Sequence, residues 1–199
     1  SAATVDVKGS DIGAIMWAHI PYSVVERRAL GDGELPLWNR YNSTGTPLLA
    51  QGQSMFGDPL HFLVIAANGA AWAWDLKFLI AKWLFAAGLG LTVFAVTRHL
   101  PAALAVTVAA PFMGFFLYRL NHLEVFSVCY ASWVFYCWVR LAGAGTVRSV
   151  AGWALGLTIA NGTLMNSGTI KEAYMLLLTL NFCGLVVLLA AGGPWRLRL

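Results

Sequence analysis

Charged residues are scarce in this chain of 199 residues. They make up 11% of it, whereas about a quarter of the residues in an ordinary soluble domain are charged. Hydrophobic residues make up 59%, and the mean hydropathy is +0.68. This composition excludes an ordinary soluble domain, and it predicts an all-α polytopic membrane protein.

Clustered basic residues and paired cysteines are also lacking. Thirteen Lys and Arg are scattered along the chain and leave a net charge of only +4, whereas a nucleic-acid-binding surface gathers its basic side chains on one face. The three cysteines, Cys129, Cys137 and Cys183, lie in apolar runs without metal-ligand spacing. We therefore expect small buried hydrophobes there, and neither a nucleic-acid partner nor a metal site.

The two ends of the sequence indicate a part of a longer protein. The chain begins at Ser1 without methionine, and no charged segment precedes an apolar core as in a signal peptide. It stops shortly after an apolar run. We expect further spans on both sides of this fragment.

Long apolar runs fill the second part of the chain. A helical span needs about 20 apolar residues, and five segments qualify, which are 78–97, 101–118, 123–141, 150–166 and 173–191. The segment 60–74 is shorter and is interrupted at Asn68 and Gly69. It predicts an interfacial or re-entrant helix with Trp72 and Trp74 at headgroup level. We expect an external region at 1–77 and about five spans within 78–199.

Arginine orients these spans. Five arginines and no acid fall on one side, and they are Arg98, Arg140, Arg148, Arg196 and Arg198. Two basic and two acidic residues fall on the other side. The positive-inside rule then places residues 1–77 and all nine acidic residues outside. Lys82 is expected to snorkel outward from the first span. No other ionisable residue is expected deep in the spans, which disfavours a transporter.

One helix of the external region carries a polar stripe. It is expected to start at Ser10 and Asp11, to kink at Pro21 and to end at Gly31. Asp11, His19 and Glu26 fall within about 80° of one another on it. Carboxylates beside a membrane can act as a general base or hold a divalent cation. The alternative is that Asp11 caps the helix and Glu26 is a solvated charge.

The loop 31–59 combines aromatic and amide side chains, which are typical of sugar-binding sites. They include the aromatic side chain of Trp38 and the amide side chains of Asn39 and Gln51. Alternatively, Trp38 packs the loop against the membrane surface, and the amides satisfy the loop's own turns. His61 is isolated in the sequence and is expected to be interfacial.

The stretch GELPLWNRYNSTGTPLLAQGQSMFGDPLHFL resembles the first external loop of bacterial YfhO-like membrane proteins. That loop usually shows Gly-x-x-Pro-Leu-Trp-Asn, then Gly-x-Pro, then a Pro before an apolar helix. The segment Gly9-Ser-Asp11 resembles the family's Gly-Asp near the start of the loop. Residues 166–174 resemble a later external turn, with Thr169 where His is usual. Arg40 replaces a common Pro.

The resemblance implies a GT-C-like transmembrane bundle with a long first external loop. It further implies an enzyme of the bacterial inner membrane that transfers a sugar from a polyprenyl-phosphate donor to an acceptor on the outer face. The family's acid corresponds to Asp11, which is the predicted catalytic base. His19, Glu26, Trp38, Asn39 and Gln51 are candidate substrate-binding residues. The partners expected are a lipid-linked sugar and membrane lipids, and no cofactor is expected beyond a divalent cation. The alternative is a non-catalytic membrane subunit whose outer loop docks a membrane protein.

Overall fold

The computed structural model describes residues 19–118 and 122–191, and it is mostly helical (74%). Four helical segments of this described part are long and apolar enough to cross a membrane. They are α4 (Ala71–Thr97), the segment Leu100–Leu117, α7 (Glu124–Ala142) and α9 (Ile170–Ala190). The structure is therefore mostly helical, with four candidate membrane-spanning helices, as the composition predicts.

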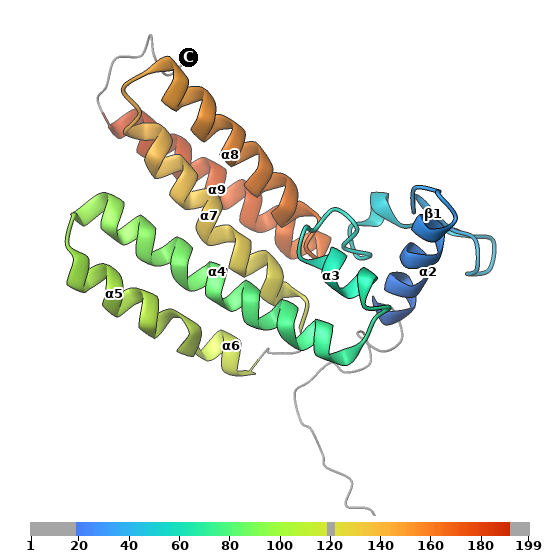
Figure 1. The fold of residues 1–199 in the computed structure, drawn as a ribbon. Coiled ribbons are helices and arrows are strands. Elements are labelled where there is room, and N and C mark those ends of the chain that lie inside the picture. Colours follow the sequence, from blue (N-terminus) through green and yellow to red (C-terminus); the bar gives the residue numbers. More distant parts are fainter. Residues whose placement is uncertain (1–18, 119–121, 192–199) are drawn as a thin grey trace, which may run out of the picture.

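Helix α8 (Val147–Met165) occupies the place of the fifth predicted span. It is 19 residues long, like α7, but it is not among the four helical segments that are also apolar enough to cross a membrane. It runs back alongside α7 (Figure 1). Its passage through the membrane stays a prediction.

Helix α7 is the centre of the bundle. It packs against α4, α8 and α9, and 67% of its span is buried, whereas 11% of the α9 span is. The chain enters and leaves neighbouring helices through short connections, so adjacent helices run antiparallel (Figure 1). This arrangement leaves most of α9 and of the Leu100–Leu117 segment facing outward, where lipid is expected.

Local sequence sets the helix ends. Arg98 takes a left-handed conformation (φ 55°) after α4, and the His99 ring accepts a hydrogen bond from the backbone N–H of Ala102 at the start of α5 (Leu100–Ala109). The Thr146 hydroxyl caps α8 in the same way through the N–H of Ser149. Pro111 then interrupts the second span, because proline lacks an N–H and clashes with the preceding turn. The span continues as the 3-10 helix η3 (Ala110–Phe112) and α6 (Gly114–Tyr118).

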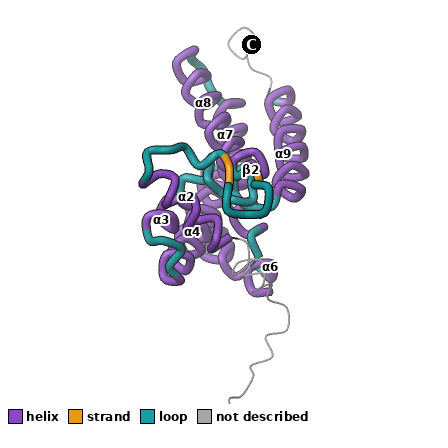
Figure 2. Tube along the Cα trace, turned by 90° about the vertical axis from the view of Figure 1, so that its right-hand side faces the viewer, coloured by secondary structure: helices purple, strands orange, loops and turns teal. Residues whose placement is uncertain are grey.

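Residues 19–70, here called the loop unit, lie against one end of the bundle (Figure 1). The loop unit consists of α2 (Ile20–Gly31), the antiparallel strands β1 (Trp38–Asn39) and β2 (Thr46–Pro47), η2 (Leu49–Gln51) and α3 (His61–Ala66). Seen from that end, its loops cross in front of the bundle helices (Figure 2). A β-carbon on Gly52 would touch Ile170, so the loop packs against the turn between α8 and α9.

The prediction of one interfacial helix at 60–74 is wrong. Helix α3 ends at Ala66, and Asn68 (φ 54°) and Gly69 (φ 74°) take left-handed conformations that stop a helix. The first span therefore begins at Ala71 rather than at residue 78. Trp74 is buried against the bundle in the first turn of α4, whereas Trp72 is exposed, and their level in the membrane stays a prediction.

Helix α2 ends at Gly31, as predicted. Pro21 lies in its first turn, where a missing N–H leaves no helical hydrogen bond unmade. The predicted helix start at Ser10 and Asp11, and hence a kink at Pro21, involve residues 1–18, which lie outside the described part of the chain.

Candidate functional site

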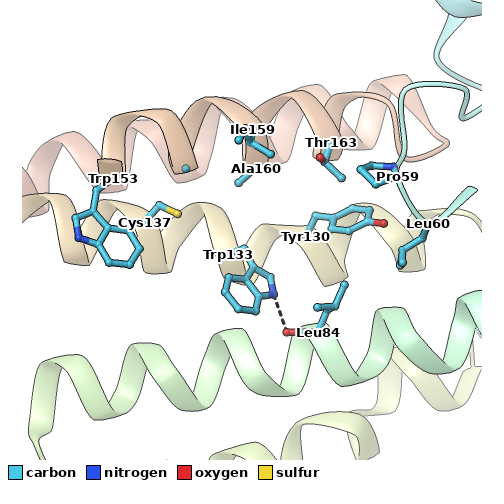
Figure 3. A pocket seen from close by; sticks show the side chains of 11 residues that line it. Pro59, Leu60, Leu84, Tyr130, Trp133, Cys137, Trp153, Ile159, Ala160 and Thr163 are labelled. Atoms are coloured by element: carbon cyan, nitrogen blue, oxygen red, sulfur yellow. Dashed lines mark hydrogen bonds between the residues drawn. The ribbon is translucent and has the colours of Figure 1, made fainter. Parts of the chain in front are cut away.

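An apolar groove of about 450 Å³ lies between α4, α7 and α8 (Figure 3). Its walls include Leu84 of α4, Trp133 and Cys137 of α7, and Trp153 and Ile159 of α8. Pro59 and Leu60 of the loop unit line its end together with Tyr130 and Thr163. The groove thus begins among membrane helices and ends at the loop unit.

The larger polar groups on the groove wall are already engaged. The Trp133 indole N–H donates to the backbone carbonyl of Leu84 at 2.9 Å, which is the dashed line of Figure 3. The Tyr130 hydroxyl donates to Asp58 Oδ1 at 2.5 Å. Because these atoms are engaged, the groove presents a mainly hydrocarbon surface, which suits an apolar chain.

Ionisable residues lie buried beside the end of the groove. Six residues form what we call the buried cluster, which are Ser23 and Glu26 of α2, Asp58, His61 of α3, Lys77 of α4 and Tyr130 of α7. Glu26, Asp58, His61 and Lys77 each have 0% of their surface exposed. Charged side chains are almost never fully buried unless they are paired, so each of these four groups must be either paired or neutral.

Lys77 is the hub of the cluster. Its ammonium group lies 2.7 Å from Asp58 Oδ2 and 3.3 Å from His61 Nδ1. It also lies 4.1 Å from the centre of the Phe126 ring and 3.1 Å from the sulfur of Met55. One cation therefore ties the loop unit to the first span, and Tyr130 extends the connection to α7 through Asp58.

These contacts determine the protonation of His61. Lys77 donates to Nδ1, so a neutral ring must carry its proton on Nε2. That nitrogen lies 3.1 Å from the Ser23 hydroxyl, whose own proton is donated to the backbone carbonyl of His19. Burial lowers the pKa of His61 well below its ordinary value of 6.5, and the nearby Lys77 and His19 lower it further. His61 is therefore neutral at physiological pH.

Glu26 is the weakly partnered member of the cluster. Its Oε2 lies 3.5 Å from His61 Nε2, and neither carboxyl oxygen has a hydrogen-bond partner of good geometry. Burial raises the pKa of Glu26 from 4.5 to about 8, although Ser54 and Lys77 act to lower it. Glu26 is therefore mostly protonated at neutral pH, and its predicted alternative role as a solvated charge is wrong.

The structure does not gather the predicted site residues in one place. Asp11 lies outside the described residues. His19 is buried, with Nδ1 2.9 Å from the backbone carbonyl of Gln53, and Glu26 joins the buried cluster. Neither lines the groove described above.

The loop candidates Trp38 and Asn39 occupy different surroundings. Trp38 is 55% exposed, and its ring covers Gly45 so closely that a β-carbon there would collide with the indole. Asn39 is buried, and its side-chain oxygen accepts a hydrogen bond from the backbone N–H of Tyr41 at 3.0 Å, as expected of an amide that satisfies its own turn. Gln51 ends η2. Sugar binding by these residues stays a prediction.

Sequence reasoning missed several members of the cluster, among them His61 and Lys77. His61 was expected to be isolated and interfacial, which is wrong, because it lies between Glu26 and Lys77. Lys77 falls inside the first span once that span begins at Ala71, so Lys82 is not the only ionisable residue there. A lysine continuous with an apolar helical run was the available signal.

The carboxylates described here do not fit a divalent cation. Among residues 19–118 and 122–191, no three His, Cys, Asp or Glu side chains come together in a way that could hold a metal. Asp58 is engaged by Lys77 and Tyr130, and Glu26 faces His61.

The fold is that of a helical bundle with four candidate membrane-spanning helices, and a buried ionic cluster joins the loop unit to this bundle. The chain matches no family model, no curated protein and no solved structure. The resemblance to YfhO-like proteins accordingly rests on the sequence motifs alone.

Proposed function

We propose that this chain is part of a glycosyltransferase of the bacterial inner membrane. It takes a sugar from a polyprenyl-phosphate donor and passes it to an acceptor on the outer face, where the loop unit lies. The observation that carries the proposal is the apolar groove between α4, α7 and α8, which ends at Pro59 and Leu60.

The groove suits the lipid part of such a donor. Its volume of about 450 Å³ falls within the range of roughly 300–1,000 Å³ that is typical of ligand pockets. Its wall is formed by Leu84, Trp133, Trp153 and similar side chains, which match a branched hydrocarbon better than a headgroup. A chain lying there would point its phosphate end towards the loop unit, where the sugar is expected to react.

The positions of the carboxylates also support a glycosyltransferase. The described carboxylates, from Glu26 in α2 to Glu172 at the start of α9, lie in the loop unit or at the helix ends near it. Glu26 and Asp58 are fully buried and cannot touch an acceptor in this conformation, so the base stays assigned to Asp11. An ionised carboxylate would take the acceptor's hydroxyl proton while the oxygen attacks the anomeric carbon. Polyprenyl phosphate then leaves with the electron pair of the broken bond.

The test is photolabelling of the full-length protein in lipid nanodiscs with a photoreactive polyprenyl phosphate. Gly156 lines the groove, so Gly156→Ile should fill it and reduce both labelling and sugar transfer by roughly tenfold, which corresponds to about 1.4 kcal/mol of binding. Gly152 lies one turn earlier on α8 and faces open space, so Gly152→Ile is the matched control and should label like wild type.

Two outcomes would contradict the proposal. Equal labelling of the two variants would show that the groove does not hold the lipid chain. Labelling at the groove without transfer from any lipid-linked sugar would favour the rival function, a non-catalytic membrane subunit.

A further inference from the structure

One short segment belongs to both the buried cluster and the groove. Asp58 pairs with Lys77 and accepts from Tyr130, and the next two residues, Pro59 and Leu60, line the end of the groove. Tyr130 itself is both a cluster member and part of the groove wall. A displacement of Asp58 or Tyr130 would therefore also move atoms that line the end of the groove.

Glu26 is the member whose charge the cluster cannot balance. It is fully buried, and neither carboxyl oxygen has a hydrogen-bond partner of good geometry. A buried anion is strongly disfavoured unless it is paired and hydrogen-bonded. The single described cation in contact with the cluster, Lys77, is already occupied by Asp58 at 2.7 Å.

Groups from every element packed around Glu26 lead to the same conclusion. Within the loop unit, His61 lies 3.5 Å from Glu26 and Ser54 acts on the pKa of Glu26. His19 acts on His61, and Asp58 pairs with Lys77. The bundle contributes Lys77 from α4 and, beyond Asp58, the Tyr130 hydroxyl from α7. His61 receives a hydrogen bond from Lys77 and gains no charge in this arrangement. Ionised Glu26 would be the second carboxylate beside a single ammonium group. The cluster would then carry a net negative charge that no solvent can reach.

We propose that Glu26 is a proton-binding site that latches the loop unit over the end of the groove. With the proton bound, α2 stays seated on α3 and the segment 54–60 stays in place. When the proton leaves, the buried negative charge drives α2 outward to water and releases Asp58, Pro59 and Leu60 from the groove. Mildly alkaline conditions thus open the groove end, and neutral or acidic conditions close it.

The pKa of about 8 at Glu26, which burial raises, places the transition just above neutral pH. The meaning of the latch for a lipid donor rests on the proposed function. The latch itself does not depend on that function, and its test uses no substrate. The latch and the proposed function can therefore fail separately.

The test is a distance measurement between spin labels in the full-length protein. Exposed positions on α2 and α9 are available, so the labelled variant carries Leu30→Cys and Met175→Cys. Cys183, which is exposed, is replaced by serine, whereas Cys129 and Cys137 are buried. Between about pH 6 and about pH 9 the distance distribution should shift to longer values and broaden. Adding Glu26→Gln, which keeps the shape but cannot ionise, should abolish that shift.

The control is Glu34→Gln, because Glu34 is an exposed carboxylate of the same loop unit that pairs with Arg40. This variant should respond to pH like wild type. Infrared spectroscopy gives an independent readout, since the C=O stretch of a protonated carboxyl group should persist at neutral pH in wild type and be lost in Glu26→Gln. A pH-independent distance in wild type, the same shift in Glu26→Gln, or the absence of that carboxyl band would each overturn the proposal.

Discussion

At the residue scale, burial gives Glu26 and His61 opposite effects on stability. The pKa of Glu26 is raised by burial. Between pH 4.5 and about pH 8 the folded protein therefore holds a proton on Glu26 that the unfolded chain has lost. Stability contributed by Glu26 therefore falls as pH rises through this window. His61 has a lowered pKa, so below 6.5 the unfolded chain binds a proton that the folded protein does not. Stability contributed by His61 is therefore lost as pH falls below 6.5.

Together these shifts predict a characteristic pH profile. Between pH 4.5 and 6.5 the contributions of Glu26 and His61 oppose each other. Above pH 6.5 only Glu26 of this pair acts, and its contribution to stability should fall by up to about 1.4 kcal/mol per pH unit towards pH 8. Glu26→Gln should instead be level above pH 6.5 and lose stability below it, because His61 is then unopposed. Thermal unfolding in detergent across this range measures both curves. Parallel curves for the two proteins would contradict the burial of the pair.

At the element scale, the bundle depends on close approach of α7 to α9 and α8. Trp138 of α7 lies directly over Gly184 of α9, so a β-carbon at Gly184 would collide with the indole ring. The same indole N–H donates to Asn181 at 3.0 Å, and Asn181 exchanges amide hydrogen bonds with Asn161 of α8 at 3.2 and 3.3 Å. Small residues and amide pairs are typical of helix contacts in lipid, where little hydrophobic force joins helices.

This contact predicts that one methyl group added at Gly184 lowers the stability of the folded protein considerably. Gly184→Ala should destabilise the protein by about 1–3 kcal/mol, because a rigid ring cannot move aside without breaking its hydrogen bond to Asn181. Gly152→Ala on α8 is the matched control, since a β-carbon there meets nothing within 4 Å and alanine favours a helix. Thermal unfolding in detergent compares the two. Equal melting temperatures would mean that α7 and α9 are farther apart than described.

At the scale of the whole molecule, the two ends of the bundle differ in their carboxylates, because the connections at the far end carry arginine and no described acid. Arg98 and the Arg140–Arg148 region lie at the end away from the loop unit, and the described carboxylates lie at the loop-unit end (Figure 1). The positive-inside rule then predicts that the loop unit faces outward.

Cysteine labelling of intact cells tests this orientation. Ser43 in the loop unit and Val147 at the start of α8 are both exposed. In a Cys183→Ser background, an impermeant maleimide should label the S43C variant from outside, and the V147C variant only after the membrane is opened. Labelling of both variants from the same side would overturn the topology.

The sequence by itself determined the properties that are local along the chain. Low charge and long apolar runs predicted a helical membrane protein, and the helix ends at Gly31 and Thr97 agree with the structure. These features could be read directly because hydropathy and capping depend on a residue and its near neighbours. Short-range exceptions, such as left-handed Asn68 and the break at Pro111, were within reach of the sequence but were misjudged or overlooked. The roles of Asp11 and of the loop residues stay predictions.

Only the tertiary structure decided that Glu26, Asp58, His61 and Lys77 share one buried cluster. They come from α2, a loop, α3 and α4, and each taken alone resembles an ordinary surface or interfacial residue. Their surroundings depend on how the loop unit folds back onto α4 and α7, which no local pattern encodes. The groove follows from the same packing, since its wall combines residues of three helices with Pro59 and Leu60. Burial and pairing are properties of elements that meet in space, so the charge states and the shape of this site arise only when the bundle is assembled.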